Sequence, residues 1–298
     1  MLYTNDVVYR PPPEQNSVLL EIATGCSYGK CDFCRYSTGE EELCLIPPDV
    51  IRKNIYILSQ AYPGRERMFL LGGNVLAFKT DFLSQLFQEI KLYFPSIRTI
   101  SMYARAKDVL NKSFDQLFSL RELGMDTLYI GIESGSDRIL KIHNKGINSA
   151  EMLAALMKLD KLGIPYGLSF IIGLGGKGSY YENATESSNF INKTYPQSIR
   201  LMTLTVFTGT VLERKVELGD FVLQDEYESL LEEEILIKNL ELDAEDTLFV
   251  ANHVSNRVPL LGLLPRDKAR ILKELRTEID SYNLGEGNGQ NIADENHW

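Results

Sequence analysis

The sequence predicts an α/β protein built around a parallel β-sheet. Apolar segments rich in β-branched residues alternate with longer amphipathic segments through most of the chain, a pattern typical of strands that alternate with helices. Strand segments such as LYIGI and LSFIIG are almost continuously apolar, which indicates burial on both faces of the sheet. A barrel and a doubly wound sheet share these properties, so the pattern leaves both architectures open.

The predicted elements follow one another in a regular order. Strands are expected over residues 17–24, 67–72, 99–103, 127–132, 165–172 and 198–206. Helices are expected over residues 48–61, 81–94, 113–123, 149–162 and 181–193. The helix ends support this reading, because Pro48 and Asp49 suit a first helical turn, whereas Gly124 and Gly163 stand where helices commonly end. A helix between each pair of strands indicates parallel neighbours.

A different pattern begins after Leu218. We expect an acidic helix over 225–239, then an irregular stretch, then a final helix over 265–282. The acidic run at 232–234 is most simply a solvated helix face. Residues 285–298 are polar and rich in Gly and Asn, so we expect a flexible tail there. The expected domains are therefore a core over 1–215, a helical C-terminal extension over 216–284, and the tail.

Composition narrows the class of protein. The 298 residues include 44 % hydrophobic and 24 % charged side chains, enough apolar material for a substantial core. The net charge of −10 disfavours a polynucleotide partner, because phosphate backbones attract basic surfaces. The N-terminal segment has neither a basic region nor an apolar run, so we expect a cytoplasmic protein with no membrane span.

Three cysteines crowd into one loop after the first strand. They read Cys26-x4-Cys31-x2-Cys34 within TGCSYGKCDFCRY, and thiolates are soft ligands for zinc or iron–sulfur clusters. A structural zinc ion would need a fourth ligand, and the chain offers Cys44, His143, His253 and His297. Plant-type [2Fe–2S] ferredoxins share the spacing but form small domains. A [4Fe–4S] cluster with three cysteine ligands would leave one iron open. We expect Cys44 itself to be a small buried hydrophobic residue.

The loop and the later strand ends resemble the radical S-adenosylmethionine (SAM) superfamily. Phe33 stands just before the last cysteine, as an aromatic residue does in that family, whose members mostly carry C-x3-C-x2-C. This chain has one more residue between the first two cysteines. The resemblance covers about 19–209. It implies a partial (β/α)6 TIM-type barrel of the radical SAM kind, a [4Fe–4S] cluster on Cys26, Cys31 and Cys34, and SAM as the second cofactor.

Two further segments resemble sites that hold the amino-acid part of SAM. Gly72-Gly73-Asn74 follows the second strand and is similar to the Gly-Gly-Glu motif that receives the SAM amino group. Asn74 replaces the usual acid, so its carbonyl would accept from the ammonium without charge assistance. Arg105, just beyond the third strand, could bind the SAM carboxylate. Tyr103 at the same strand end either lines the substrate cavity or packs in the core.

Two more strand ends resemble the part of the site that holds the nucleoside. Glu133 and Ser134 end the fourth strand, where the family contacts the ribose and Glu133 could accept from both hydroxyls. Ile171 and Gly173 end the fifth strand, similar to the GxIxGxxE segment near the adenine, although its terminal glutamate is missing here. Because the carboxyl ends of parallel strands share one edge, these segments are expected to meet.

The resemblance implies an enzyme that cleaves SAM reductively to a 5′-deoxyadenosyl radical. An electron donor such as flavodoxin or ferredoxin would supply the electron, and the substrate could be a nucleoside, a tetrapyrrole or another small molecule. The residues themselves assign no catalytic group to that substrate. The alternative is an iron–sulfur electron carrier or a zinc-stabilised binding protein without SAM chemistry.

A polar cluster near the C-terminal end adds a second open question. Residues 252–257 include Asn252, His253, Ser255, Asn256 and Arg257. We expect this segment either to close over the mouth of a barrel or to cover the bottom of the sheet.

Overall fold

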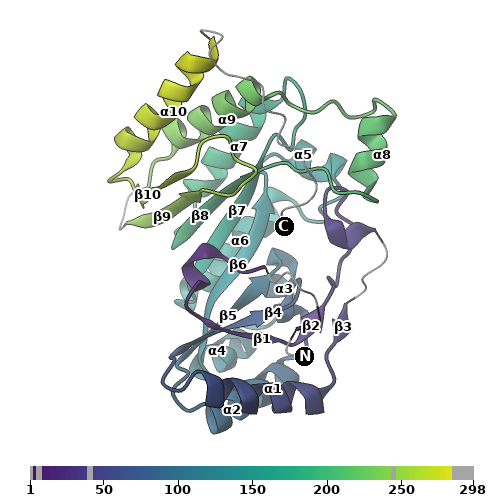
Figure 1. The fold of residues 1–298 in the computed structure, drawn as a ribbon, viewed down its shortest axis with the longest axis vertical. Coiled ribbons are helices and arrows are strands. Elements are labelled where there is room, and N and C mark those ends of the chain that lie inside the picture. The colour runs from purple at the N-terminus through teal and green to yellow at the C-terminus, as the bar shows by residue number, and fades with distance from the viewer. Residues whose placement is uncertain (1–2, 5–8, 39–42, 243–245, 284–298) are drawn as a thin grey trace. The chain divides into compact units, whose positions relative to one another are not determined.

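A strand is present in each of the six predicted strand segments in the computed structural model of the protein (Figure 1). The structure describes residues 3–4, 9–38, 43–242 and 246–283, so the predicted tail at 285–298 lies outside the described residues. The chain divides into two compact units, Met1–Gly131 with Ala150–Gly167, and Ile132–Ser149 with Leu168–Trp298. The domain boundaries expected from the sequence stay a prediction.

The first unit is built on four neighbouring strands. In spatial order these are β1 (Val18–Glu21), β4 (Arg67–Leu71), β5 (Thr99–Ala104) and β6 (Met125–Glu133), and each adjacent pair runs parallel. The strands are apolar on both faces, and Leu20, Phe69 and Met102 are fully buried. Burial of each such side chain contributes about 1.5–3 kcal/mol. The parallel arrangement places the carboxyl ends of all four strands at one edge.

Helices complete the first unit. They are α1 (Pro48–Ala61), α2 (Thr80–Tyr93), α3 (Ala106–Asn111), α4 (Phe114–Glu122) and α6 (Ser149–Lys161). Helix α1 packs beside α2, and α2 packs beside α4 (Figure 1). Helix α4 begins where the Ser113 hydroxyl accepts from the Gln116 N–H at 3.1 Å, and the Gln116 side chain accepts from the Ser113 N–H, which forms a capping box. Gly124 follows with a φ of 104°, a conformation that glycine adopts without strain.

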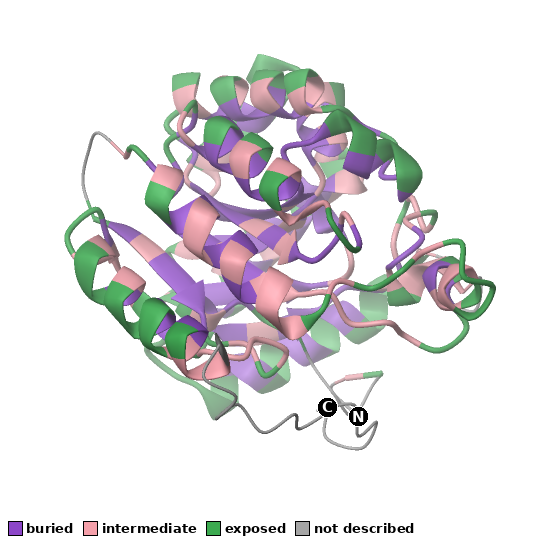
Figure 2. Cartoon of the chain, turned by 90° about the horizontal axis from the view of Figure 1, so that it is seen from above, coloured by how far each residue is buried: buried purple, intermediate pink, exposed green. Residues whose placement is uncertain are grey.

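The second unit contains the remaining strands of the sheet. In spatial order these are β7 (Tyr166–Ile172), β8 (Ser198–Thr203), β9 (Thr247–Ala251) and β10 (Leu260–Leu264). Its helices are α5 (Asp137–Ile142), α7 (Tyr180–Ile191), α8 (Val211–Glu217), α9 (Glu226–Asn239) and α10 (Lys268–Asn283). Helix α9 packs between α7 and α10 (Figure 1). Figure 2 shows buried residues along the strands and exposed residues on the outer faces of the helices.

The C-terminal extension differs from the prediction in one respect. Both expected helices are present, as α9 and α10, but the stretch between them is not irregular. It forms β9, which pairs parallel with β8, and β10, which pairs antiparallel with β9. Each strand has only five residues, too few to show a clear period. In the part of the chain that the structure describes, no helix is long and apolar enough to span a bilayer.

Candidate functional site

The three predicted cluster ligands lie on one loop between β2 (Ala23–Thr24) and β3 (Cys44–Leu45). Cys26, Cys31 and Cys34 form no disulfide bond, and each is partly exposed. The Cys34 N–H donates to the Cys31 carbonyl at 3.0 Å. The Ser37 N–H and hydroxyl both donate to the Cys34 carbonyl, at 2.8 and 2.7 Å. These bonds hold Cys31 and Cys34 in one tight turn.

The donor set of this loop fits an iron–sulfur cluster. Thiolates are the usual protein ligands of such clusters, and these three cysteines form no disulfide and are partly exposed. Within the described ranges, no three His, Cys, Asp or Glu side chains are arranged to hold a single metal ion. A [4Fe–4S] cluster that is bound by three thiols has one iron without a protein ligand, which is open to another ligand.

Cys44 contradicts the expectation of a buried residue. It begins β3, lies opposite Thr24 of β2 and is exposed. The reason is that β2 and β3 form a sheet of only two strands, which leaves side chains uncovered. Because Thr24 stands two residues before Cys26, this pairing folds the loop back and joins its two ends.

The turn after β4 packs directly against the cysteine loop. The Gly73 N–H donates to the Gly25 carbonyl at 3.0 Å. A Cβ atom on Gly73 would lie 3.2 Å from the Cys26 Cβ and 2.3 Å from the Gly25 carbonyl oxygen, the latter far closer than any real contact. Only glycine therefore fits at position 73, and the predicted Gly72-Gly73 motif supports the backbone next to Cys26.

Asn74 binds the cysteine loop through its side chain. Its Oδ1 accepts from the Ser27 N–H at 2.9 Å, and its Nδ2 donates to the Ser27 hydroxyl at 2.6 Å. The same Nδ2 donates to Oδ2 of Asp108 at 2.8 Å. Asn74 has no exposed surface, so its amide is committed to these neighbours.

Arg105 contacts the same loop from the end of β5. Its guanidinium carbon lies 4.0 Å from the centre of the Tyr28 ring, a cation–π contact. Asp108, three residues later, accepts from the Arg105 N–H at 3.3 Å. Burial raises the pKa of the Asp108 carboxyl, while the Asn74 hydrogen bond and the Arg105 charge oppose that rise. Sequence reasoning missed Asp108; its place at the third position of a helix was the available signal.

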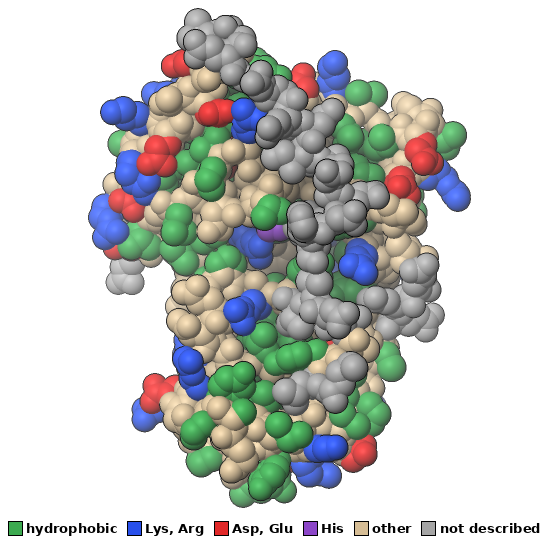
Figure 3. Space-filling model, in the orientation of Figure 1, with side chains coloured by type: hydrophobic (Ala, Val, Ile, Leu, Met, Phe, Trp, Pro, Cys, Tyr) green, Lys and Arg blue, Asp and Glu red, His purple; other side chains and the backbone are tan. Residues whose placement is uncertain are grey.

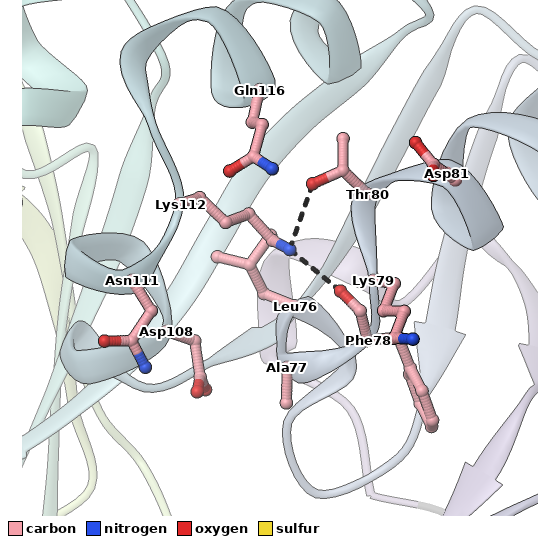
Figure 4. Close-up of a pocket in the computed structure, with 10 residues that line it drawn as sticks. All are labelled: Leu76, Ala77, Phe78, Lys79, Thr80, Asp81, Asp108, Asn111, Lys112 and Gln116. Atoms are coloured by element: carbon pink, nitrogen blue, oxygen red, sulfur yellow. Dashed lines mark hydrogen bonds between the residues drawn. The ribbon is translucent and has the colours of Figure 1, made fainter.

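A pocket of about 320 Å³ opens beside Asp108 (Figure 4). It lies among η3 (Val75–Ala77), the start of α2, and α3 with the residues after it. The Lys112 ammonium donates to the Phe78 carbonyl at 2.8 Å and to the Thr80 hydroxyl at 3.4 Å. Burial lowers the pKa of Lys112, and the nearby Asp108 charge opposes that change.

Tyr103 packs against other aromatic residues of the first unit. Its ring centre lies 5.1 Å from that of Phe69 and 6.4 Å from that of Tyr129, in edge-to-face geometry. The Tyr129 hydroxyl donates to the buried Glu14 carboxylate at 2.9 Å. Of the two roles expected for Tyr103, the structure shows packing. Phe33, predicted near the cofactors, is also buried.

In the second unit, Glu133 combines a strained backbone with a buried ion pair. Its φ is 70°, a left-handed conformation that costs a residue other than glycine about 1–3 kcal/mol. Its carboxylate accepts from the Lys145 ammonium at 2.9 Å, and the two side chains are only 12 % and 8 % exposed. Lys145 gave no signal in the sequence, because it lies in a loop twelve residues away. Strain of this kind concentrates at functional sites.

Ser134 lies in a hydrogen-bonded network with residues of α7. Its hydroxyl donates to Oδ1 of Asn183 at 2.5 Å and accepts from the Ser136 N–H at 3.0 Å. Nδ2 of Asn183 donates to the Ile171 carbonyl at 3.1 Å. Ser134 is fully buried. Asn183 thus connects two of the strand ends at which the sequence predicts nucleoside contacts.

The turn after β7 is held by a glutamate from α9. The Glu232 carboxylate accepts from the Gly173 N–H with both oxygens at 3.2 Å, and from Asn183 at 2.6 Å and Gln224 at 2.8 Å. The predicted solvated face at 232–234 is therefore wrong: Glu232 and Glu233 are buried, and Glu234 pairs with Arg276 at 2.6 Å. Helix α9 packs between α7 and α10. These neighbours bury residues that the acidic sequence alone predicts to be exposed to solvent.

The segment after β9 ties two strand ends together. Asn256 accepts from the Thr203 N–H at 2.8 Å and donates to the Leu201 and Ala251 carbonyls, at 3.0 and 2.9 Å. Leu201 and Thr203 end β8, and Ala251 ends β9. The segment therefore lies at the carboxyl edge of these strands, the edge expected to carry the site. Burial, with the Arg200 charge, lowers the pKa of His253 to about 4.

Comparison with known proteins identifies the family. The family model of the radical SAM superfamily matches residues 20–186. This chain belongs to the radical SAM superfamily. Membership confirms the expected enzyme class, its fold class, and a [4Fe–4S] cluster with SAM as the family's cofactors. The roles of individual residues toward these cofactors stay predictions.

Solved structures support the same fold for this radical SAM protein. It resembles coproporphyrinogen III oxidase from Escherichia coli, with a TM-score of 0.57 and 17 % identity over 74 % of this chain and 50 % of that one. It also resembles methylornithine synthase, with a TM-score of 0.55 and 15 % identity over 90 % of this chain and 81 % of that one.

Two curated relatives match this chain over only part of their own length. The radical SAM chain is 25 % identical over 284 residues to 4'-phospho-dehydrooxetanocin synthase from Priestia megaterium, which covers 89 % of this chain and 36 % of that protein. It is 31 % identical over 182 residues to a tRNA-2-methylthio-N(6)-dimethylallyladenosine synthase from Vesicomyosocius okutanii, over 56 % of this chain and 39 % of that protein. The chain thus spans less than two fifths of the length of these relatives.

Proposed function

We propose that this protein binds a [4Fe–4S] cluster through Cys26, Cys31 and Cys34 and cleaves SAM reductively to act on a small molecule or nucleoside. The observation that carries the proposal is the cysteine loop, in which three thiols lie together next to a Gly73 backbone that admits no side chain. When bound, the cluster and SAM supply a one-electron cleavage that yields a 5′-deoxyadenosyl radical.

The cysteine loop and the ends of β4 and β5 would hold the cluster and the amino-acid end of SAM. The cysteines ligate three irons, and the Gly72-Gly73 backbone approaches closely because neither residue has a side chain. Arg105 offers a guanidinium for a carboxylate. Its contact with Tyr28 keeps that side chain next to the loop.

The residues predicted to contact the nucleoside end of SAM lie at the ends of β6 and β7. Glu133 supplies carboxylate oxygens that accept from ribose hydroxyls, and Lys145 limits the cost of burying that charge. The backbone at Ile171 and Gly173 offers an edge for adenine. Asn183 and Glu232 position that backbone through their hydrogen bonds.

The charge of the molecule favours a small substrate over a polynucleotide. The net charge is −10, and basic and acidic side chains are interspersed on the face of α9 and α10 drawn in Figure 3. Of the residues of these two helices, Arg276 pairs with Glu234, and Arg270 with Glu274. We place the enzyme in the cytoplasm, where flavodoxin or ferredoxin supplies the electron.

Anaerobic reconstitution with iron and sulfide tests the proposed function. We expect a reduced [4Fe–4S] signal by electron paramagnetic resonance that changes when SAM is added, and 5′-deoxyadenosine when dithionite is also present. C31A should lose both. C44A is the matched control and should keep both, because Cys44 lies on β3 rather than in the tight turn. A protein that holds only zinc or [2Fe–2S], and forms no 5′-deoxyadenosine, would refute the proposal.

A further inference from the structure

Two departures of this chain from the family pattern meet at one place. The first is the extra residue between Cys26 and Cys31, and the second is Asn at position 74. Ser27, the first residue of the lengthened segment, exchanges two hydrogen bonds with the Asn74 amide, at 2.9 and 2.6 Å. Tyr28, the second, lies under the Arg105 guanidinium at 4.0 Å. The lengthened segment is therefore bound by the ends of β4 and β5.

Asp108 completes this group of residues. Its Oδ2 accepts from Nδ2 of Asn74 at 2.8 Å. We refer to Ser27, Asn74 and Asp108 together as the Asn74 clasp. Asn74 serves the clasp because an amide donates with one atom while it accepts with the other. A carboxylate could accept from Ser27 but could donate nothing to Asp108.

An acid at position 74 would conflict with Asp108. Its oxygen would stand about where the amide nitrogen is, 2.8 Å from the Asp108 oxygen, and two carboxylates at that distance cannot both ionise. The structure therefore accommodates one negative charge at this place. That charge is on residue 108.

Asp108 is the more exposed of these two residues. Asn74 is 0 % exposed, whereas Asp108 is 8 % exposed and lines the pocket of Figure 4. Helix capping explains only part of the role of Asp108, because its bond to the Arg105 N–H is 3.3 Å, longer than its 2.8 Å bond to Asn74. Capping of α3 also involves neither Ser27 nor Asn74.

We propose that the acid expected at position 74 has moved to Asp108, which supplies the negative charge for the SAM amino group, while Asn74 is a positioning residue that holds the cysteine loop. This inference rests on the proposed function for the identity of the ligand. The contacts within the clasp do not depend on it.

An exchange of the two side chains tests the proposal, because Asp and Asn have nearly the same shape. The variants are N74D, D108N and the double variant N74D/D108N, with D115N as a control at an exposed acid on α4. Each is measured three ways: the melting temperature of the cluster-free protein, iron bound after anaerobic reconstitution, and the equilibrium dissociation constant for SAM with the cluster in place.

We expect N74D to lower the melting temperature and the iron content, because it brings two carboxylates together. The double variant should restore both, since the carboxylate now at position 74 would accept from Ser27 and from the amide now at position 108. D108N alone should keep its iron, because the oxygen of the introduced amide can still accept from Asn74. It should bind SAM about tenfold more weakly without the charge. D115N should match the natural protein in all three.

The results separate the two proposals. If N74D melts and loads iron like the natural protein, or the double variant is no better than N74D, the clasp is refuted. If D108N binds SAM as the natural protein does, Asp108 does not supply the charge. If the natural protein itself holds no [4Fe–4S] cluster, the proposed function fails, and the melting temperatures still decide whether Asn74 and Asp108 are coupled.

Discussion

Glu133 shows how much one residue can contribute to a site through its backbone and its charge together. It ends a buried strand in a left-handed conformation, and its carboxylate lies 2.9 Å from the Lys145 ammonium. Neither feature stabilises the fold by itself, because the conformation is strained and burial of an ion pair is costly. Their combination at one strand end is typical of a residue retained for function.

Removal of Lys145 should therefore be costly. We expect K145M to lower the free energy of unfolding by about 3–5 kcal/mol, because it leaves a buried carboxylate without this cation. Urea denaturation of the cluster-free protein measures the change. The control is R52M, which breaks the exposed Arg52–Glu89 pair and should destabilise the protein far less, because solvent screens exposed ion pairs. Equal losses in the two variants would contradict the special role of the buried pair.

A methyl group at position 73 should disturb the cysteine loop. G73A would place its Cβ 2.3 Å from the Gly25 carbonyl oxygen, so the loop must move, and we expect reconstituted G73A to lose most of its iron. G64A provides the comparison, since Gly64 has a φ of 80° and no atom within 4 Å of its Cβ position. It should cost about 1–2 kcal/mol through strain alone and keep its iron.

The site residues that the sequence can suggest are those whose signal is local. The cysteine spacing and the paired glycines are visible within a few letters of sequence. Their partners are not, because Asn74 and Asp108 are 34 residues apart, and Gly173 and Glu232 are 59 apart. In each pair a helix residue meets the end of a strand that is distant in sequence, so a single sequence does not indicate them.

At the scale of elements, α9 makes buried contacts that its acidic composition does not predict. Its acidic run predicts a solvated face, yet Glu232 and Glu233 are buried. The Glu232 carboxylate accepts a hydrogen bond from the backbone N–H of Gly173. No acid close to Gly173 in the sequence is needed for this contact. Helix α9 thus supports the turn that follows β7.

Glu233 should make the stability of the protein depend on pH. Burial, with the nearby Glu232 charge, raises the pKa of Glu233 to about 8 from its ordinary value of 4.5. The folded state therefore binds this proton more tightly than the unfolded state. Its stabilising contribution is complete below about pH 4.5 and is lost as the pH rises through 8, with a slope of up to about 1.4 kcal/mol per pH unit.

The variant E233Q tests this dependence, because Gln imitates the protonated acid. We expect E233Q to gain stability over the natural protein as the pH rises from about 5 to 8, as measured by urea denaturation at several pH values. E241Q, at an exposed acid just beyond α9, should leave the pH profile unchanged. Parallel profiles for E233Q and the natural protein would show that Glu233 is ionised throughout.

The strands and the long helices were predictable within a few residues, whereas the short elements were not. Helix α1 matches its prediction at both ends, Pro48 and Ala61, because fourteen residues show a clear helical period. Helices α3 and α5 have six residues each, fewer than two turns, and β9 and β10 have five. Their formation depends on packing against elements distant in sequence, which no local pattern records.

At the scale of the whole molecule, charge restricts the partners. A net charge of −10 opposes the approach of a phosphate backbone. We expect no saturable binding of tRNA by filter retention at about 0.1 M salt, although some relatives are named for a tRNA product. A bovine serum albumin sample, also acidic, is the control for background retention. Tight binding that weakens steeply with salt would instead indicate a local basic surface and a polynucleotide substrate.

The pairing of β2 with β3 has a consequence for how the cluster is assembled. Because Ala23 lies opposite Leu45 and Thr24 opposite Cys44, backbone pairing joins the two ends of the cysteine loop without involving Cys26, Cys31 or Cys34. This pairing therefore offsets part of the entropy of loop closure independently of iron ligation. In small zinc domains the free energy of metal binding drives folding. Here it does not have to close the loop, so a cluster could be lost and rebuilt while the surrounding sheet stays folded.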